Sequence, residues 1–372
     1  MVFLQRVYIS FLVLHTQLLM YLAESEYPPC NLDEKCISLA RCTSLLPFLK
    51  PHNMTPAEKA VFEDRYCGYG PKGQELLDRV LICCPNMGHI LPNTQICGPI
   101  MPAYRIFGGE ETQPNELPWM ALILYAHRSR SVWNERLVSR CAGSLITNRY
   151  VLTAAHCLRI TGLDLRRVRL GEHNILSNPD CVTHINGREH CAPEHLEIDV
   201  DLSIKHRHYM VFEERPYNDI ALLRLKFPVR YTAQIKPICV QLDYIFSNPS
   251  FSNHKLQIAG WGLSHKQGYS NVLLQAYVNG RNADECSLSE PSLGLDKETH
   301  ICAGNLGGND TCKGDSGGPL MAIMERGDEE FVYLAGITSY GYSQCGYGPA
   351  AYTKTSKFVE WILWNMYTNI FQ

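Results

Sequence analysis

The stretch DTCKGDSGGP, residues 310–319, decides how this 372-residue chain is interpreted. It places Ser316 among glycines, and a serine hydroxyl becomes a useful nucleophile only when a neighbouring base activates it. Glycines permit a tight turn and leave room for the backbone of a substrate. Such a turn can aim the N–H groups of Gly314 and Ser316 at one oxyanion. The stretch therefore predicts a nucleophilic serine if the chain also supplies a base and a carboxylate. Otherwise it is a glycine-rich loop that contains a serine.

Two further motifs supply these partners. LTAAHC (152–157) contains His156, and YNDIAL (217–222) contains Asp219. Each is weak by itself, because most of the 14 histidines must be surface or hydrogen-bonded core residues. Together with Ser316 they give the chain order His–Asp–Ser, one of the known orders of an acyl-transfer triad. We expect His156 to accept the serine proton and return it to the leaving amine, and a buried Asp219 to fix the imidazole tautomer.

The composition indicates a secreted, disulfide-bonded protein of two or three domains. Its 34 basic and 37 acidic residues leave a net charge of -3, and no basic stretch is dense enough to form a nucleic-acid groove. Sixteen cysteines spread along the chain are rare in the cytosol without metal-ligand spacing. Residues 1–23, with Arg6 before a broken apolar run, read as a signal peptide, the alternative being a signal anchor. No later segment has the length of a membrane span.

Residues 27–87 are expected to form a small domain that is cross-linked by disulfides, because a hydrophobic core of this size contributes little stability. The cysteines concerned are Cys30, Cys36, Cys42, Cys67, Cys83 and Cys84. Cys83 and Cys84 are adjacent and cannot readily bond to each other, and spacing alone does not choose among the connectivities. Asn53 begins a glycosylation sequon, which in a secreted chain marks a surface loop.

Residues 88–105 are rich in proline and glycine and predict a linker. Arg105 in an exposed linker, followed by Ile106, is a target for a trypsin-like protease, the alternative being an ordinary loop. From residue 106 onward short apolar runs alternate with turn signals, which predicts an all-β domain over 106–372. Only the C-terminus has helical spacing, with apolar residues on one face.

In this order TAAHC, DIAL and GDSGGP resemble the chymotrypsin-like serine proteases. The resemblance covers residues 106–372 and implies a double six-stranded β-barrel with a C-terminal helix and with the site between the barrels. It implies that cleavage after Arg105 frees the ammonium of Ile106, which then pairs with Asp315 and orders the oxyanion hole at Gly314 and Ser316.

The same resemblance implies a substrate pocket for basic side chains. Asp310 would form its floor and favour Arg or Lys, since leaving a buried carboxylate unpaired is costly. Ser339 and Gly341 would form one wall. The family commonly has glycine where Ala350 stands, so the methyl group of Ala350 should narrow this pocket.

The six-cysteine module, linker and protease domain together resemble the clip-domain serine proteases of arthropods. That resemblance implies disulfides that use all sixteen cysteines. The pairs are Cys30–Cys83, Cys36–Cys67, Cys42–Cys84, Cys97–Cys239, Cys141–Cys157, Cys181–Cys191, Cys286–Cys302 and Cys312–Cys345. A zinc site near Cys181 and Cys191 is disfavoured by this complete pairing. Catalysis needs no cofactor, but related loops bind calcium near residues 171–174, with Glu172 the better candidate ligand and Asp180 the weaker. The alternative there is a solvated loop without metal.

We therefore expect a secreted zymogen of a trypsin-like endopeptidase that acts in haemolymph, without nucleic-acid or membrane partners. By resemblance its partners are an upstream activating protease, a serpin inhibitor and a protein substrate. The substrate would be a cytokine precursor of the Spätzle type in Toll signalling, or prophenoloxidase in melanisation. The alternative is a non-catalytic clip homologue that acts as a cascade cofactor, although the triad and Asp310 are present. A digestive trypsin is disfavoured, because bulk digestion has no use for the clip module.

Overall fold

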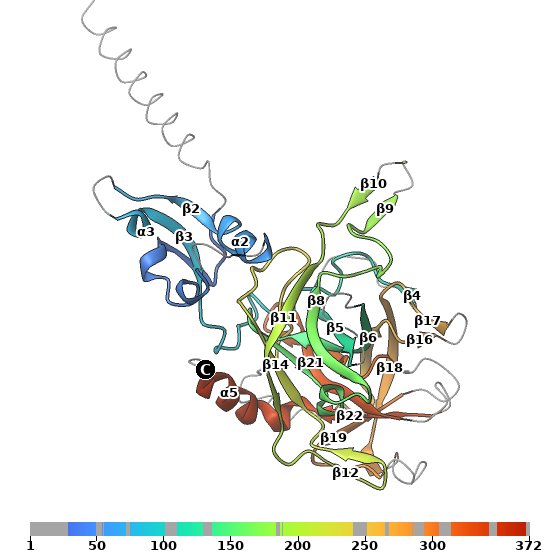
Figure 1. Cartoon of the computed structure of the whole chain (residues 1–372). Helices are drawn as coiled ribbons and strands as arrows, with labels where there is room; N and C mark the ends of the chain where they lie inside the picture. Colours follow the sequence, from blue (N-terminus) through green and yellow to red (C-terminus); the bar gives the residue numbers. More distant parts are fainter. Residues whose placement is uncertain are drawn as a thin grey trace, which may run out of the picture. The chain divides into compact units, whose positions relative to one another are not determined.

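The computed structural model describes residues 29–49, 54, 56–71, 75–100, 110–128, 136–183, 187, 189–240, 251–264, 268–284, 286, 294–304, 314–341 and 348–369. The chain forms two compact units, residues 1–86 and 87–372 (Figure 1). Several predictions lie outside the described residues: the signal peptide over residues 1–23, Asn53, Arg105, Ile106, Asp310 and the Cys312–Cys345 pair. Within the described ranges no helix has the length and apolar character needed to cross a membrane.

The first unit is a three-stranded antiparallel sheet with short helices. Strands β1 (Glu34–Ser38), β3 (Val80–Pro85) and β2 (Tyr66–Tyr69) lie in that order, accompanied by α2 (Pro56–Glu63) and α3 (Leu76–Arg79). The central strand β3 carries Cys83 and Cys84, and successive side chains of a strand point to opposite faces. They therefore bond to two different segments, and the unit contains Cys30–Cys83, Cys36–Cys67 and Cys42–Cys84. The pairing implied by the clip resemblance is present.

The second unit begins with a closed six-stranded barrel in the order β11-β14-β7-β6-β5-β8. Its strands are β5 (Met120–His127), β6 (Leu137–Leu145), β7 (Tyr150–Thr153), β8 (Leu163–Leu170), β11 (Leu196–Lys205) and β14 (Ala221–Leu225). Apolar side chains such as Ile123, Val168 and Leu222 are fully buried in it. The Cys141–Cys157 disulfide ties β6 to the short 3-10 helix η4 (Ala155–Leu158). We call this barrel 1.

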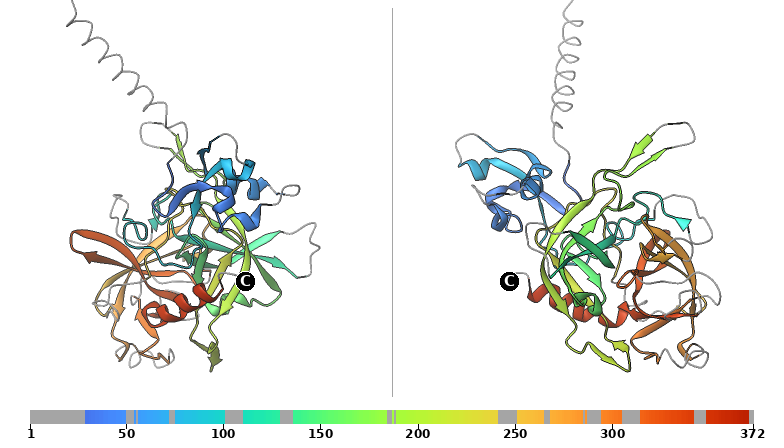
Figure 2. Two further views of the ribbon diagram at one scale, coloured as in Figure 1. Left: turned by 90° about the vertical axis from the view of Figure 1, so that its left-hand side faces the viewer. Right: turned by 45° about the vertical axis from the view of Figure 1, so that its right-hand side comes forward.

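Barrel 2 has the order β15-β20-β21-β22-β19-β18 and closes through β15–β18, with β4 (Glu110–Glu111) added beside β18. Its strands are β15 (Lys255–Gly260), β18 (Leu274–Arg281), β19 (His300–Ala303), β20 (Pro319–Arg326), β21 (Glu329–Tyr340) and β22 (Ala350–Lys354). The right-hand view of Figure 2 shows the two barrels side by side. The 3-10 helix η7 (Thr355–Phe358) leads into α5 (Val359–Thr368), which buries Ile362 and Met366. The expected double barrel with a C-terminal helix is confirmed.

Three short hairpins extend the barrels: β9 (Cys181–Thr183) with β10 (Glu189–Cys191), β12 (Met210–Phe212) with β13 (Arg215–Tyr217), and β16 (Leu263–Ser264) with β17 (Gly268–Tyr269). The Cys181–Cys191 disulfide closes the first hairpin, where the two cysteines are also register partners. This hairpin projects from barrel 1 (Figure 1). Cys286–Cys302 is present in barrel 2.

The segment predicted as a linker is fixed to the second unit over part of its length. Cys97 is bonded to Cys239. The N–H of Gly98 donates to the carbonyl of Pro237 at 2.8 Å, and the N–H of Val332 donates to the carbonyl of Gly98 at 2.8 Å. One covalent bond and two backbone hydrogen bonds therefore anchor the chain ahead of the predicted cleavage point.

Candidate active site

His156 and Asp219 form a hydrogen-bonded pair on barrel 1. His156 lies in η4 directly after β7, and Asp219 lies between β13 and β14. The Nδ1–H of His156 donates to Oδ2 of Asp219 at 2.7 Å, and the backbone N–H of His156 donates to Oδ1 at 2.9 Å. Because the buried carboxylate only accepts, the proton of the neutral imidazole sits on Nδ1. Nε2 is thereby left free to accept a proton from a nucleophile.

Barrel 2 holds the same aspartate through two hydroxyl groups. Ser339 on β21 donates from Oγ to Oδ2 of Asp219 at 2.5 Å. Thr353 on β22 donates from Oγ1 to the backbone carbonyl of Asp219 at 2.9 Å, and Thr353 is fully buried. The aspartate of one barrel is thus positioned by strands of the other. Sequence reasoning placed Ser339 in the substrate wall, but it missed Thr353.

Burial and charge act in opposite directions on the two titrating groups. Burial opposes ionisation of Asp219, yet the charge of His156 and the hydrogen bonds from His156 and Ser339 hold the pKa of Asp219 below its usual value. Burial also opposes protonation of His156, and the charge and hydrogen bond of Asp219 outweigh it, so the pKa of His156 is raised. The pair is therefore arranged to keep Asp219 ionised and to make His156 a stronger base.

The turn that carries Ser316 lies directly against barrel 1. The backbone N–H of Ala142 on β6 donates to the carbonyl of Ser316 at 2.8 Å. A side chain on Gly317, whose φ is +77°, would come within 2.1 Å of the hydroxyl of Thr153. The sulfur of Cys157, the residue next to His156, lies 3.7 Å from the carbonyl oxygen of Ser316. Only glycine permits this approach, which brings the serine segment alongside the histidine segment.

The carboxylate of Asp315 lies against two glycines, Gly260 and Gly262. Its Oδ1 accepts the backbone N–H of Gly262 at 2.8 Å. A Cβ atom at Gly260 would lie 2.0 Å from this carboxylate, and one at Gly262 would lie 2.4 Å from it. The segment Gly260–Gly262 therefore has to remain free of side chains at both ends, a requirement that sequence reasoning missed. A glycine on each side of Trp261 was the available signal.

The structure describes the residues predicted to form the substrate wall, but not Asp310, the predicted floor. Ser339 lies near the end of β21 and Gly341 directly follows it, while Ala350 begins β22 with 2% of its surface exposed. A Cβ atom built on Gly341 would lie 3.1 Å from the Cβ of Ala350. The methyl group of Ala350 therefore faces Gly341 directly. Both residues were predicted to line the substrate pocket.

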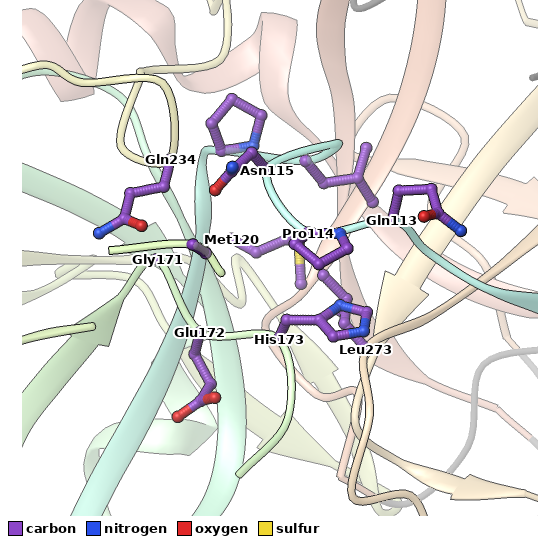
Figure 3. A pocket seen from close by; sticks show the side chains of 12 residues that line it. Gln113, Pro114, Asn115, Met120, Gly171, Glu172, His173, Gln234 and Leu273 are labelled. Carbon is purple, nitrogen blue, oxygen red and sulfur yellow. The ribbon is translucent and has the colours of Figure 1, made fainter. Parts of the chain in front are cut away.

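The loop proposed for calcium has its oxygens otherwise engaged. Oδ2 of Asp180 accepts the backbone N–H groups of His173 and Asn174, both at 2.9 Å, and Oδ1 accepts the hydroxyl of Ser177 at 2.6 Å. Figure 3 shows the carboxylate of Glu172 pointing away from the imidazole of His173. Oε2 of Glu172 accepts a hydrogen bond from a guanidinium, that of Arg169, at 2.6 Å. These carboxylates do not fit a calcium ion, which takes six to eight oxygen ligands and depends on carboxylates among them, because the guanidinium and the loop N–H groups already occupy theirs.

Other metal-like clusters involve disulfide sulfurs. Across the described residues, each group of three or more His, Cys, Asp or Glu atoms close enough to share an ion contains bonded cysteines. Cystine sulfur lacks the thiolate charge that binds zinc.

An imidazole oriented by a buried carboxylate lies at two six-stranded barrels and beside a glycine-framed serine, which is the arrangement of the chymotrypsin-like class of serine proteases. Residues 106–362 match the family model described as Trypsin, and residues 31–84 match the one described as Regulatory CLIP domain of proteinases. The chain belongs to the trypsin family of serine proteases and carries a clip domain.

Similar proteins share both parts. Spaetzle-processing enzyme of Drosophila melanogaster is 37% identical over 365 residues, covering 90% of each chain. Serine protease ea of the same organism is 36% identical and covers 88% of this chain and 87% of its own. Among solved structures, the Drosophila Grass clip serine protease of the Toll pathway is 30% identical with a TM-score of 0.62, covering 90% of this chain and 95% of its own.

We expect the pKa of His156 to lie above its ordinary value of about 6.5 and to fall below that value in the Asp219→Asn variant. The substitution removes the charge that stabilises the imidazolium, while burial continues to oppose it. NMR titration of the imidazole measures both values. An unchanged pKa in the variant would contradict the electrostatic interpretation. The Asp219→Asn substitution should also lower any peptidase activity by about 10⁴-fold.

Thr353→Val should lower kcat by about tenfold with little change in KM, because the carbonyl of Asp219 loses its donor and the carboxylate loses its fixed position. Thr353→Ser keeps the hydroxyl and should stay close to the wild type. Steady-state kinetics after cleavage at Arg105 measure both variants. Equal losses in the valine and serine variants would mean that Thr353 contributes packing instead of position.

Proposed function

We propose that this chain is the secreted zymogen of a trypsin-like serine endopeptidase in an extracellular cascade, activated by cleavage after Arg105. The observation that carries the proposal is the His156–Asp219 pair, supported from barrel 2 and lying beside the Ser316 turn. Membership of the trypsin family supports the reaction class. The new terminus at Ile106 would pair with Asp315, whose carboxylate already accepts the N–H of Gly262.

In the proposed reaction Oγ of Ser316 attacks the carbonyl carbon of the scissile bond while Nε2 of His156 accepts its proton. The N–H groups of Gly314 and Ser316 stabilise the oxyanion. The imidazolium then protonates the leaving amine, and the C–N bond breaks to give an acyl-enzyme. A water molecule, deprotonated by His156, releases the acid and restores the serine hydroxyl.

The proposed specificity is for Arg or Lys before the cleaved bond. Asp310 would supply the charge at the pocket floor, and Ser339 and Gly341 would form the wall. The methyl group of Ala350, which faces Gly341, reduces the width available to the side chain. A long, thin cationic chain remains the best match to a narrowed pocket with an acidic floor.

The proposed partners follow from the relatives. One is named for processing Spaetzle, another is named Melanization protease 1, and a third, from Holotrichia diomphalia, is named Phenoloxidase-activating factor 1. We infer an upstream protease as activator, a protein precursor of one of these kinds as substrate and a serpin as inhibitor. The clip unit is too small to carry the triad and would serve to dock a partner. Haemolymph is the compartment that we infer for the protein.

Cleavage at Arg105 followed by assay on an arginyl amide tests the activity. The cleaved protein should hydrolyse the amide, and Ser316→Ala should lower kcat by about a millionfold while folding normally. The uncleaved chain is the control for activation. Absence of hydrolysis that depends on Ser316 would favour the second candidate, a non-catalytic cofactor, which only the position of Ala350 supports.

Ala350→Gly should raise kcat/KM for arginyl or lysyl amides by about tenfold, because it restores the width of the pocket. Ala351→Gly is the matched control, since neighbouring residues of β22 point to opposite faces and Ala351 is also fully buried. A decrease in the Ala350 variant would show that the methyl group orients the substrate. If the cleaved wild type is inactive and Ala350→Gly is active, the methyl group of Ala350 blocks the substrate pocket. The wild type would then act as a non-catalytic cofactor.

A further inference from the structure

A network of charged side chains joins the two ends of the loop between β8 and β11, the loop in which calcium was expected. Arg169 lies near the end of β8, Glu172 opens the loop, and Glu197 lies in β11. Arg169 and Glu197 are register partners across the antiparallel pair. The network therefore closes the base of a long insertion that includes the β9–β10 hairpin.

The guanidinium of Arg169 bridges both carboxylates. Its Nη1 donates to Oε2 of Glu172 at 2.6 Å, while Nη2 and Nε donate to Oε1 of Glu197 at 2.6 and 2.9 Å. A planar guanidinium offers several donors in a fixed fork, so one side chain can hold two carboxylates in a set geometry. The contacts are charge-assisted and short.

The burial of Glu172 makes this bridge necessary. Its side chain has 0% exposure, against 18% for Arg169 and 26% for Glu197. Burial raises the pKa of Glu172, and the hydrogen bond and charge of Arg169 oppose that rise. A buried carboxylate without a positive partner is strongly destabilising. Nδ1 of His195 lies 3.3 Å from the same oxygen of Glu172.

A small cavity adjoins Glu172 on the side away from its carboxylate. The adjoining cavity, lined by Gly171, Glu172, Gln234 and their neighbours in Figure 3, has a volume of about 10 Å³. That is about the room of one water molecule. Among the described residues, Oε1 of Glu172 is the carboxylate oxygen of the expected ligand pair that has no hydrogen bond. One oxygen does not make a calcium site.

We propose that Arg169 takes the place of calcium in this loop. Its guanidinium is a permanent internal cation that fixes Glu172 against Glu197 and orders the loop, so the fold needs no metal ion there. The inference concerns stability and does not rest on the proposed peptidase activity.

Thermal unfolding of the full-length chain in millimolar calcium and in a chelator tests the proposal. The wild type should melt at the same temperature in both. Arg169→Gln should melt several degrees lower in chelator, and calcium should now raise its melting temperature, because two carboxylates face the space the guanidinium has left. Arg167→Gln is the matched control: it lies two residues earlier on β8 and contacts Glu197 and Asp199 but not Glu172. It should remain near the wild type and be insensitive to calcium.

A second measurement keeps the test independent of variant folding. Terbium is added to the wild type and to Glu172→Gln as a luminescent calcium mimic. We expect the two proteins to show the same terbium luminescence, because the wild type has no saturable site that involves Glu172. A saturable site lost in Glu172→Gln would overturn the proposal. So would a wild-type melting temperature that rises with calcium, or an Arg169→Gln variant as stable in chelator as the wild type.

Discussion

The rest of the site depends on the hydrogen bonds made to the buried carboxylate of Asp219. Taking an ionised carboxylate out of water is costly unless donors replace the lost solvent. Barrel 1 supplies the imidazole and the backbone N–H of His156. Barrel 2 supplies the hydroxyl of Ser339, and Thr353 holds the main chain of the aspartate. The charge is satisfied only when both barrels are in place, so the geometry of the base is a property of the interface between them.

The segment that carries Ser316 also depends on contacts with the opposite barrel. It belongs to barrel 2, but its carbonyl is held by Ala142 of β6. Gly317 fits against Thr153 only because it lacks a side chain. The Ser316 segment and the His156–Asp219 pair therefore each have contacts with the opposite barrel. Relative sliding of the barrels would disturb both contacts together.

Local motifs allowed His156 and Asp219 to be predicted as a pair, because their neighbours in sequence are distinctive and their chain order is informative. The pairing of the clip cysteines could be predicted only by resemblance, since spacing admits several connectivities. Thr353 could not be found in this way. It is an ordinary threonine in a strand, and only the packing of β22 brings it to Asp219.

The loop expected to bind calcium shows how much a ligand motif leaves open. The sequence displays Glu172 and Asp180, but it does not display where their oxygens point. Asp180 turns inward to accept N–H groups of its own loop. Arg169 contacts Glu172, three residues further along the chain, and the register of β8 and β11 also sets it opposite Glu197. Cross-strand register is a tertiary property, and a single sequence gives little information about it.

The anchor at Cys97 and Gly98 has a consequence for what a cut at Arg105 can release. Only residues 99–105 separate the anchor from the bond that would be cleaved. The N-terminal product would remain a covalent light chain with a short free end. A partner bound to the clip unit would then keep the same effective concentration near the catalytic unit before and after the cut. On the proposed function, cleavage would therefore not release a partner that is bound to the clip unit.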